Sequence, residues 1–233
     1  MKLYFYGASD GFPTQHGIIK DAQAALDHLV QRTDIDTSRI VVFGRSLGGA
    51  VGAVLARNNP DKMMLILELI LGKVVVIRYF MNMLDGIEKV SAVILENTFT
   101  SILDMAGVML PFLKVFIGKS GSKSPKVLNF VVRSPWNTID VIGELDIKRP
   151  ILFLSGLKDE MVPPSHMKML YAKAAARNSK CLFVEFPTGM HMNTYEIGGV
   201  RYWGTIHEFL SKWVPERKDN HSSRVALSEL EGR

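Results

Sequence analysis

The pentapeptide Gly44-Arg45-Ser46-Leu47-Gly48 has the pattern Gly-x-Ser-x-Gly, which is typical of a nucleophilic serine on a sharp turn. It ends a short apolar run rich in β-branched residues, 39–44, and opens a stretch of small residues, 47–57. These stretches predict a strand followed by a helix, and the tight turn between them needs small residues on both sides of the serine. The N-terminus of that helix favours negative charge that develops on a bound carbonyl oxygen. In this context the motif predicts Ser46 as a nucleophile.

A serine hydroxyl is a poor nucleophile at neutral pH, so it needs a base, and the base needs a carboxylate that orients it. Of the six histidines, His191 is the one in a loop directly after a predicted buried strand, 181–186. Asp159 lies in the loop after the preceding predicted strand, 150–155. The order serine, acid, histidine along the chain is the α/β-hydrolase order. We therefore expect Ser46, Asp159 and His191 to form a catalytic triad.

Each of these assignments has a simpler alternative. Ser46 would then be a buried turn serine, and His191 a solvated loop histidine. Asp159 would be a loop cap, with Glu160 or Glu96 as the acid. The shared position of all three residues at strand ends favours the triad.

Strands and helices alternate along most of the chain. The predicted strands are 39–44, 91–96, 150–155 and 181–186, and the predicted helices are 14–32, 47–57, 165–177 and about 203–213. Short, continuously apolar strands between helices are typical of an α/β fold, whose mostly parallel sheet carries helices on both faces.

Three regions depart from this alternation. Residues 99–142 are apolar, helical in patches and broken by glycine and proline, which predicts a helical cap. Residues 63–89 form an atypical insertion, and its three central charges favour a buried or interfacial helix over a membrane span. The tail, 215–233, is rich in charge and predicted to be disordered. The domain prediction is a partial α/β-hydrolase domain over 1–214.

The composition excludes several classes of protein. The one cysteine, Cys181, forbids an intramolecular disulfide, and with no His/Cys cluster at ligand spacing we expect no metal site. The net charge is +5, but the sequence has no dense basic stripe with interleaved aromatic residues. No nucleic-acid partner is therefore expected. The proposed chemistry requires no cofactor.

Five segments resemble one family, the alpha/beta hydrolase domain-containing protein 13 and bud-emergence-like serine hydrolases, and most closely its plant wavy-growth type. The segments are 44–51, 94–102, 152–159, 162–164 and 186–195. The resemblance runs from about residue 6 to residue 212 with one interruption, at 63–89.

The resemblance implies a serine esterase or thioesterase, and some relatives are acyl-protein (palmitoyl) thioesterases. By motif it makes Ser46 the nucleophile, Asp159 the acid and His191 the base. It also makes the backbone N–H of Leu47 one oxyanion donor. The implied substrates are acyl esters or lipidated proteins.

Family members begin earlier, with a membrane-anchoring helix and the first strands of the sheet. The resemblance therefore implies an N-terminally truncated chain that opens near the fourth strand, at 3–6, and that is soluble or peripheral. It lacks the loop that supplies the second oxyanion N–H, so a catalytically impaired scaffold or regulatory protein is the alternative function. Amide cleavage by the same triad is a third hypothesis. The apolar and basic stretch 99–149 suggests contact with an anionic membrane surface, with a solvated cap as the alternative.

Overall fold

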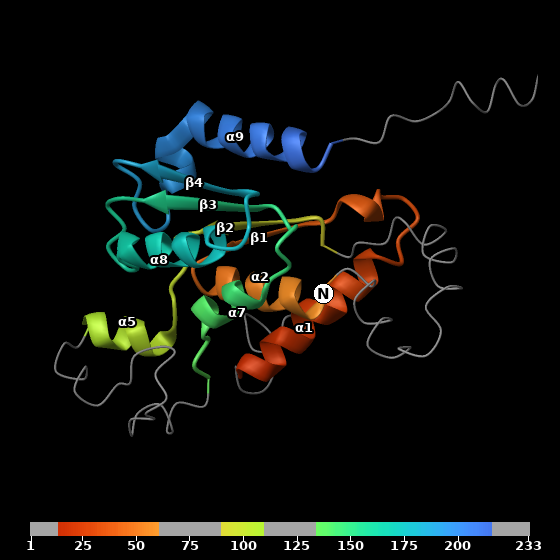
Figure 1. The fold of residues 1–233 in the computed structure, drawn as a ribbon, viewed down its shortest axis with the longest axis horizontal. Coiled ribbons are helices and arrows are strands. Elements are labelled where there is room, and N and C mark those ends of the chain that lie inside the picture. Colours follow the sequence, from red (N-terminus) through yellow and green to blue (C-terminus); the bar gives the residue numbers. More distant parts are fainter. Residues whose placement is uncertain (1–13, 61–89, 110–133, 216–233) are drawn as a thin grey trace, which may run out of the picture.

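Four parallel strands form the centre of the molecule (Figure 1). The structure is a computed structural model, and it describes residues 14–60, 90–109 and 134–215. The strands follow one another in chain order: β1 (Val41–Arg45), β2 (Ala92–Glu96), β3 (Ile151–Gly156) and β4 (Cys181–Phe186). Because they are parallel, their carboxyl ends meet at one edge of the sheet, with Arg45 opposite Glu96 and Glu96 opposite Leu154.

Helices cover both faces of this sheet (Figure 1). On one face lie α1 (Gln15–Leu29), α2 (Leu47–Asn58), α7 (Thr138–Glu144) and α8 (Pro164–Ala175), and on the other lies α9 (Thr194–Trp213). A hydrophobic core lies on each face of the sheet, and alternate residues of β2 point into one or the other. Val93 and Leu95 pack with α1, α2, α7 and α8, and Ala92 and Ile94 pack with α9. This burial on both faces explains why the strand reads as a continuous apolar run.

The predicted α/β fold with a parallel sheet is confirmed, and most element boundaries agree within three residues. Thr14 caps α1, since its side chain accepts a hydrogen bond from the backbone N–H of Gly17. The predicted start of the last helix near residue 203 is wrong, because α9 begins at Thr194. Gly199 has φ 47°, and this kink interrupts the helical repeat that the sequence pattern relies on.

Only the two ends of the predicted cap at 99–142 are described. One end forms α5 (Ile102–Met109), which projects away from the sheet (Figure 1). The other end belongs to α7, whose Val141 and Ile142 join the core against α2 and α8. This second end therefore packs as part of the layered fold.

Other predicted segments lie outside the described residues. They are the strand at 3–6, the insertion 63–89, residues 110–133 of the cap, and all of the tail but its first residue. Within 14–60, 90–109 and 134–215, no helix combines the length and hydropathy needed to cross a bilayer.

Candidate active site

Ser46 occupies a strained turn between β1 and α2. Its φ of 53° and ψ of −122° lie outside the regions that residues with a side chain prefer, and such strain is often found at functional sites. The Ser46 backbone N–H donates to the carbonyl of Glu96 on the neighbouring strand, at 2.9 Å. This hydrogen bond joins the turn to the end of β2.

The turn brings strand and helix backbones so close that a side chain at Gly44 would collide with the backbone of Gly48 and Gly49. A side chain at Gly49 would collide with Thr98, whereas Gly48 has open space around it. The expected need for small residues on both sides of Ser46 is thus met by Gly44 and Gly49. The second glycine of the pentapeptide is not sterically required.

Asp159 and His191 form a buried pair. Oδ2 of Asp159 lies 2.8 Å from Nδ1 of His191, and the two side chains are 1% and 3% exposed. The other carboxylate oxygen of Asp159 accepts from the backbone N–H groups of Met161, at 2.9 Å, and Val162, at 2.7 Å. A proton on Nδ1 that points at the carboxylate leaves Nε2 with a free lone pair, which is the nitrogen a general base uses.

The two alternative acids have other roles. Oε2 of Glu160 accepts from the backbone N–H of His191, at 3.1 Å, and so holds the loop. Among the described residues it has no hydrogen bond to the ring. Glu96 pairs with Arg45 at 3.0 Å and accepts from the hydroxyl of Tyr202 at 3.0 Å. Of these three carboxylates, Asp159 is the one bonded to the imidazole.

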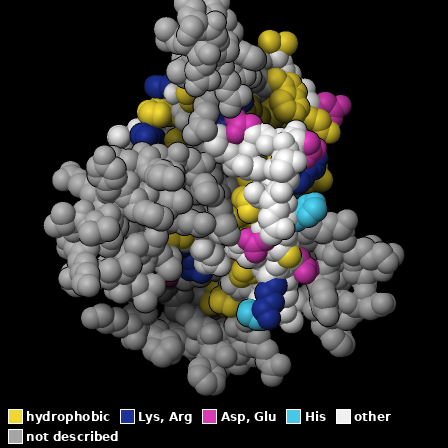
Figure 2. Space-filling model, turned by 90° about the vertical axis from the view of Figure 1, so that its right-hand side faces the viewer, with side chains coloured by type: hydrophobic (Ala, Val, Ile, Leu, Met, Phe, Trp, Pro, Cys, Tyr) yellow, Lys and Arg dark blue, Asp and Glu magenta, His cyan; other side chains and the backbone are white. Residues whose placement is uncertain are grey.

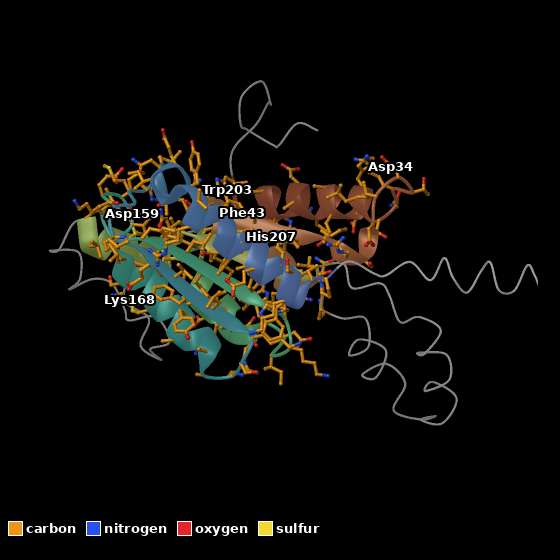
Figure 3. The ribbon with its side chains drawn as sticks, turned by 90° about the horizontal axis from the view of Figure 1, so that it is seen from above. Asp34, Phe43, Asp159, Lys168, Trp203 and His207 are labelled. Atoms are coloured by element: carbon orange, nitrogen blue, oxygen red, sulfur yellow. The ribbon has the colours of Figure 1, made fainter. Side chains whose placement is uncertain are left out.

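The serine turn and the histidine loop are joined through their neighbours. Arg45 Nη1 donates to the carbonyl of Met192 at 3.4 Å, so the residue before Ser46 contacts the residue after His191. Asp159 lies close to the start of α9, at the end of the sheet seen in Figure 3. Within the described ranges no hydrogen bond joins the Ser46 hydroxyl to the His191 ring, and such catalytic contacts are often long in ligand-free proteins.

Leu47 is the first residue of α2. The backbone N–H groups of the first helical turn have no partner within the helix, so the Leu47 N–H is available to a bound oxygen atom. In the described part of the chain, no group of three or more His, Cys, Asp or Glu residues could hold a metal ion. Burial raises the pKa of the Cys181 thiol to about 11, so this cysteine stays protonated at neutral pH.

Sequence reasoning missed the polar residues that surround this site. Asn97 donates to the histidine loop, and Tyr202 reaches the buried Glu96 from α9. Burial raises the pKa of the Glu96 carboxyl, and the charge of Arg45 opposes that rise. A polar pair at the end of a buried strand, Glu96-Asn97, is the signal that could have found Asn97.

A second buried histidine, His166, also escaped assignment. It lies in α8, and its Nδ1 accepts from the backbone N–H of Thr100 at 3.2 Å. Burial lowers its pKa, although the charges of Asp104 and Asp159 act in the opposite direction. This histidine is therefore neutral in the folded protein at pH 7.

Charged side chains of both signs are interspersed over the part of the described surface that Figure 2 shows, where apolar side chains gather at the top. This face is the right-hand side of Figure 1, away from the carboxyl ends of the strands.

Comparisons with known proteins show what this chain is similar to. The family model "Prolyl oligopeptidase family" matches residues 13–68. The chain is 66% identical to "Alpha/beta hydrolase domain-containing protein WAV2" of Arabidopsis thaliana over 219 residues, which cover 94% of this chain and 62% of that protein. It is 33% identical to "Protein bem46" of Schizosaccharomyces pombe over 207 residues, covering 89% of this chain and 55% of that protein. An uncharacterized membrane protein of Saccharomyces cerevisiae is 34% identical, with 88% and 57% covered.

Solved structures share the fold. An esterase from Pyrococcus furiosus superposes with a TM-score of 0.58 at 16% identity, covering 88% of this chain and 65% of the esterase. An alpha-beta hydrolase from Vibrio vulnificus gives a TM-score of 0.56 at 22% identity, covering 89% and 61%. The chain spans between 55% and 62% of the length of the three curated relatives.

Proposed function

This chain is an α/β hydrolase related to WAV2 and bem46, and on that premise we propose that it is a serine hydrolase cleaving carboxylic esters or thioesters of acyl chains. The observation that carries the proposal is the buried hydrogen bond from His191 to Asp159, on loops at the same edge of the sheet as the strained Ser46 turn. A hydrolase of this type needs a serine lifted off the sheet and a histidine whose Nε2 is unprotonated.

In the proposed mechanism the Ser46 hydroxyl attacks the substrate carbonyl while Nε2 of His191 takes the hydroxyl proton. The Asp159 carboxylate stabilises the imidazolium, and the Leu47 N–H donates to the oxyanion of the tetrahedral intermediate. Collapse of this intermediate expels an alcohol or thiol, which takes the proton from the imidazolium. Water, activated by the same histidine, then hydrolyses the acyl-enzyme and releases the carboxylic acid and free Ser46.

Apolar side chains around the site support an acyl substrate. Met161 lies two residues after Asp159, and Met190 and Met192 flank His191. All three side chains are exposed. Exposed apolar side chains beside a polar reaction centre suit a hydrocarbon chain attached to an ester or thioester. Within this class we propose lipid-modified proteins, such as palmitoylated proteins, as the substrates.

An activity probe tests the proposal. The chain is incubated with a fluorophosphonate, which labels serine nucleophiles, and with a p-nitrophenyl acyl ester. We expect labelling and ester hydrolysis by the wild type, and Ser46→Ala should lower kcat by about 10⁶-fold, as expected when a triad serine is lost.

Ser155→Ala is the matched control. Ser155 is a buried serine at the end of β3 whose hydroxyl has no hydrogen-bond partner among the described residues, so its loss should leave labelling intact. Labelling that persists in Ser46→Ala would contradict the proposed nucleophile.

A catalytically impaired scaffold or regulatory protein is the second candidate. What separates it from the hydrolase is whether the hydroxyl of Ser46, which has no hydrogen bond to the ring of His191 among the described residues, reacts with a substrate. A folded wild-type chain that is neither labelled nor hydrolytic would select this function. Turnover of acyl-peptide p-nitroanilides in preference to esters would instead indicate a peptidase.

A membrane surface is the proposed second partner. The support is the similarity to the yeast relative, which is described as an uncharacterized membrane protein, together with the exposed apolar side chains at the site. Co-sedimentation with liposomes tests this contact, and binding that ignores the anionic lipid content would count against an electrostatic contribution.

A further inference from the structure

The carboxyl end of β2 is in contact with all three loops that carry the proposed triad. Glu96 and Asn97, the residues at this end, are 0% and 1% exposed. The carbonyl of Glu96 accepts from the backbone N–H of Ser46 at 2.9 Å. The two side chains extend this contact to the other two loops.

Asn97 uses both ends of its amide. Oδ1 accepts from the backbone N–H of Gly156 at 2.8 Å, at the start of the loop that carries Asp159. Nδ2 faces three oxygen atoms: the carbonyls of His191 at 3.1 Å and Met190 at 3.2 Å, and the hydroxyl of Thr194 at 3.0 Å. One side chain thus holds the acid loop and the histidine loop at once.

The chemistry of this contact selects an amide. The Gly156 N–H needs an acceptor, and the two carbonyls need a donor; an amide group supplies both on one planar unit. The backbone of Asn97 has φ 46°, a conformation that asparagine adopts more readily than most residues. A residue that only filled space at this position would need neither the amide group nor the positive φ.

The side chain of Glu96 also contributes to holding the histidine loop, through Arg45. It pairs with Arg45 at 3.0 Å, and Arg45 reaches the carbonyl of Met192 and lies over the ring of Tyr195, 5.2 Å from its centroid. Tyr202 of α9 donates to the same carboxylate. The histidine loop is therefore held by both residues at the end of β2.

We infer that Asn97 is a positioning residue, which keeps the loops of Asp159 and His191 in register with Ser46, and that Glu96 assists it through Arg45. The inference rests on the proposed function. A misplacement of about 1 Å in a catalytic group can cost about 10²-fold in rate, so a side chain that joins two catalytic loops has a measurable effect without touching substrate.

The test variant is Asn97→Asp. It keeps the size, the tolerance for positive φ and the acceptor for Gly156, but it turns a carboxylate oxygen toward two carbonyl oxygens. We expect kcat for the acyl ester to fall about 100-fold while KM changes less than about threefold. We also expect the imidazole Nδ1–H signal of His191 in NMR spectra of the full chain to shift or broaden.

Asn178→Asp is the matched control. Asn178 is also buried, its Nδ2 donates to the carbonyl of Arg149, and its Oδ1 accepts from the backbone N–H of Lys180. It lies before β4, at the opposite edge of the sheet from the site. Its replacement should lower the melting temperature but leave kcat within about twofold, because the loops at the carboxyl ends are untouched.

The outcomes separate the inference from the proposed function. Unchanged kcat and an unchanged His191 signal in Asn97→Asp overturn the inference. A wild type without labelling or turnover overturns the proposed function, and the His191 signal then still decides the inference. If Asn97→Asp does not fold, Asn97→Gly replaces it, since glycine also accepts positive φ. Failure of both variants to fold overturns the inference in favour of a structural role.

Discussion

Two histidines of this chain are equally buried, at 2% exposure each, yet their surroundings differ. His191 lies in the loop after β4, and its Nδ1 faces a carboxylate, that of Asp159. His166 lies in α8, and its Nδ1 faces a backbone N–H, that of Thr100. The carboxylate favours the tautomer of His191 with the proton on Nδ1, which leaves Nε2 free to accept a proton. The backbone N–H favours the tautomer of His166 in which Nδ1 is the acceptor.

Burial therefore does not single out the histidine that we propose as the general base. The group opposite Nδ1 is more informative, because it sets which ring nitrogen has a lone pair that can accept a proton. The carboxylate neighbouring His166 is that of Asp104, and the hydroxyl of Thr100 lies between them. This hydroxyl is 2.8 Å from Nδ1 of His166 and 2.6 Å from Oδ2 of Asp104. His166 is suited to join α8 to the segment before α5.

The largest effect is expected for His191→Gln. Glutamine preserves a polar side chain but has no nitrogen that takes a proton at neutral pH, so the general base is lost. We expect kcat to fall by about 10⁶-fold, as for removal of a triad histidine. Ester hydrolysis and fluorophosphonate labelling measure the loss, and a residual kcat above one hundredth of wild type would contradict the base assignment.

A smaller loss is expected for Asp159→Asn. The amide still accepts from Met161 and Val162, but its NH₂ group turned toward His191 favours the tautomer with the proton on Nε2. A fall in kcat of about 10⁴-fold follows from the wrong tautomer. Glu160→Gln is the control. It retains an oxygen acceptor for the backbone N–H of His191, so its kcat should stay within about threefold of wild type. Equal losses in both variants would refute the choice of acid.

His166→Gln should separate stability from activity. The hydrogen bond to Thr100 is weakened in a buried site, which lowers the free energy of unfolding by about 1–3 kcal/mol. We expect kcat to remain within about threefold of wild type, in contrast to His191→Gln. Thermal unfolding and ester hydrolysis of the same preparation check both parts. His28→Gln, an exposed change in α1, serves as the reference.

The smallest effect is a pH dependence of stability. Burial holds the pKa of His166 below its usual value of 6.5, so between the folded and unfolded pKa values only the unfolded chain binds this proton. The contribution of His166 to the free energy of unfolding is therefore fully present above about pH 6.5. It is lost as the pH falls toward the folded pKa, by at most about 1.4 kcal/mol per pH unit. Urea unfolding from pH 7 to pH 5 should show a shallower fall in His166→Gln than in wild type. Parallel curves would contradict the assignment.

Most of the described sheet was predictable because its strands are short, apolar and bounded by polar turns. Cys181–Phe186 was located to the residue, and the serine turn followed from glycines that only a close approach of two backbones explains. The start of α9 was not predictable, since the positive φ of Gly199 breaks its pattern. The role of Asn97 was also hidden, because its partners lie 59 to 97 residues further along the chain.

The amino-acid sequence by itself determined the alternation of strands and helices, the serine turn and the set of candidate acids, since all of these are local patterns. Tertiary structure decided which of Asp159 and Glu160, adjacent in the chain, faces the ring of His191. The loop after β3 sends the Asp159 carboxylate to the ring of His191 and the Glu160 carboxylate to its backbone N–H. Asp159 and Glu160 have different partners because the path of that loop in space sets the direction of each side chain.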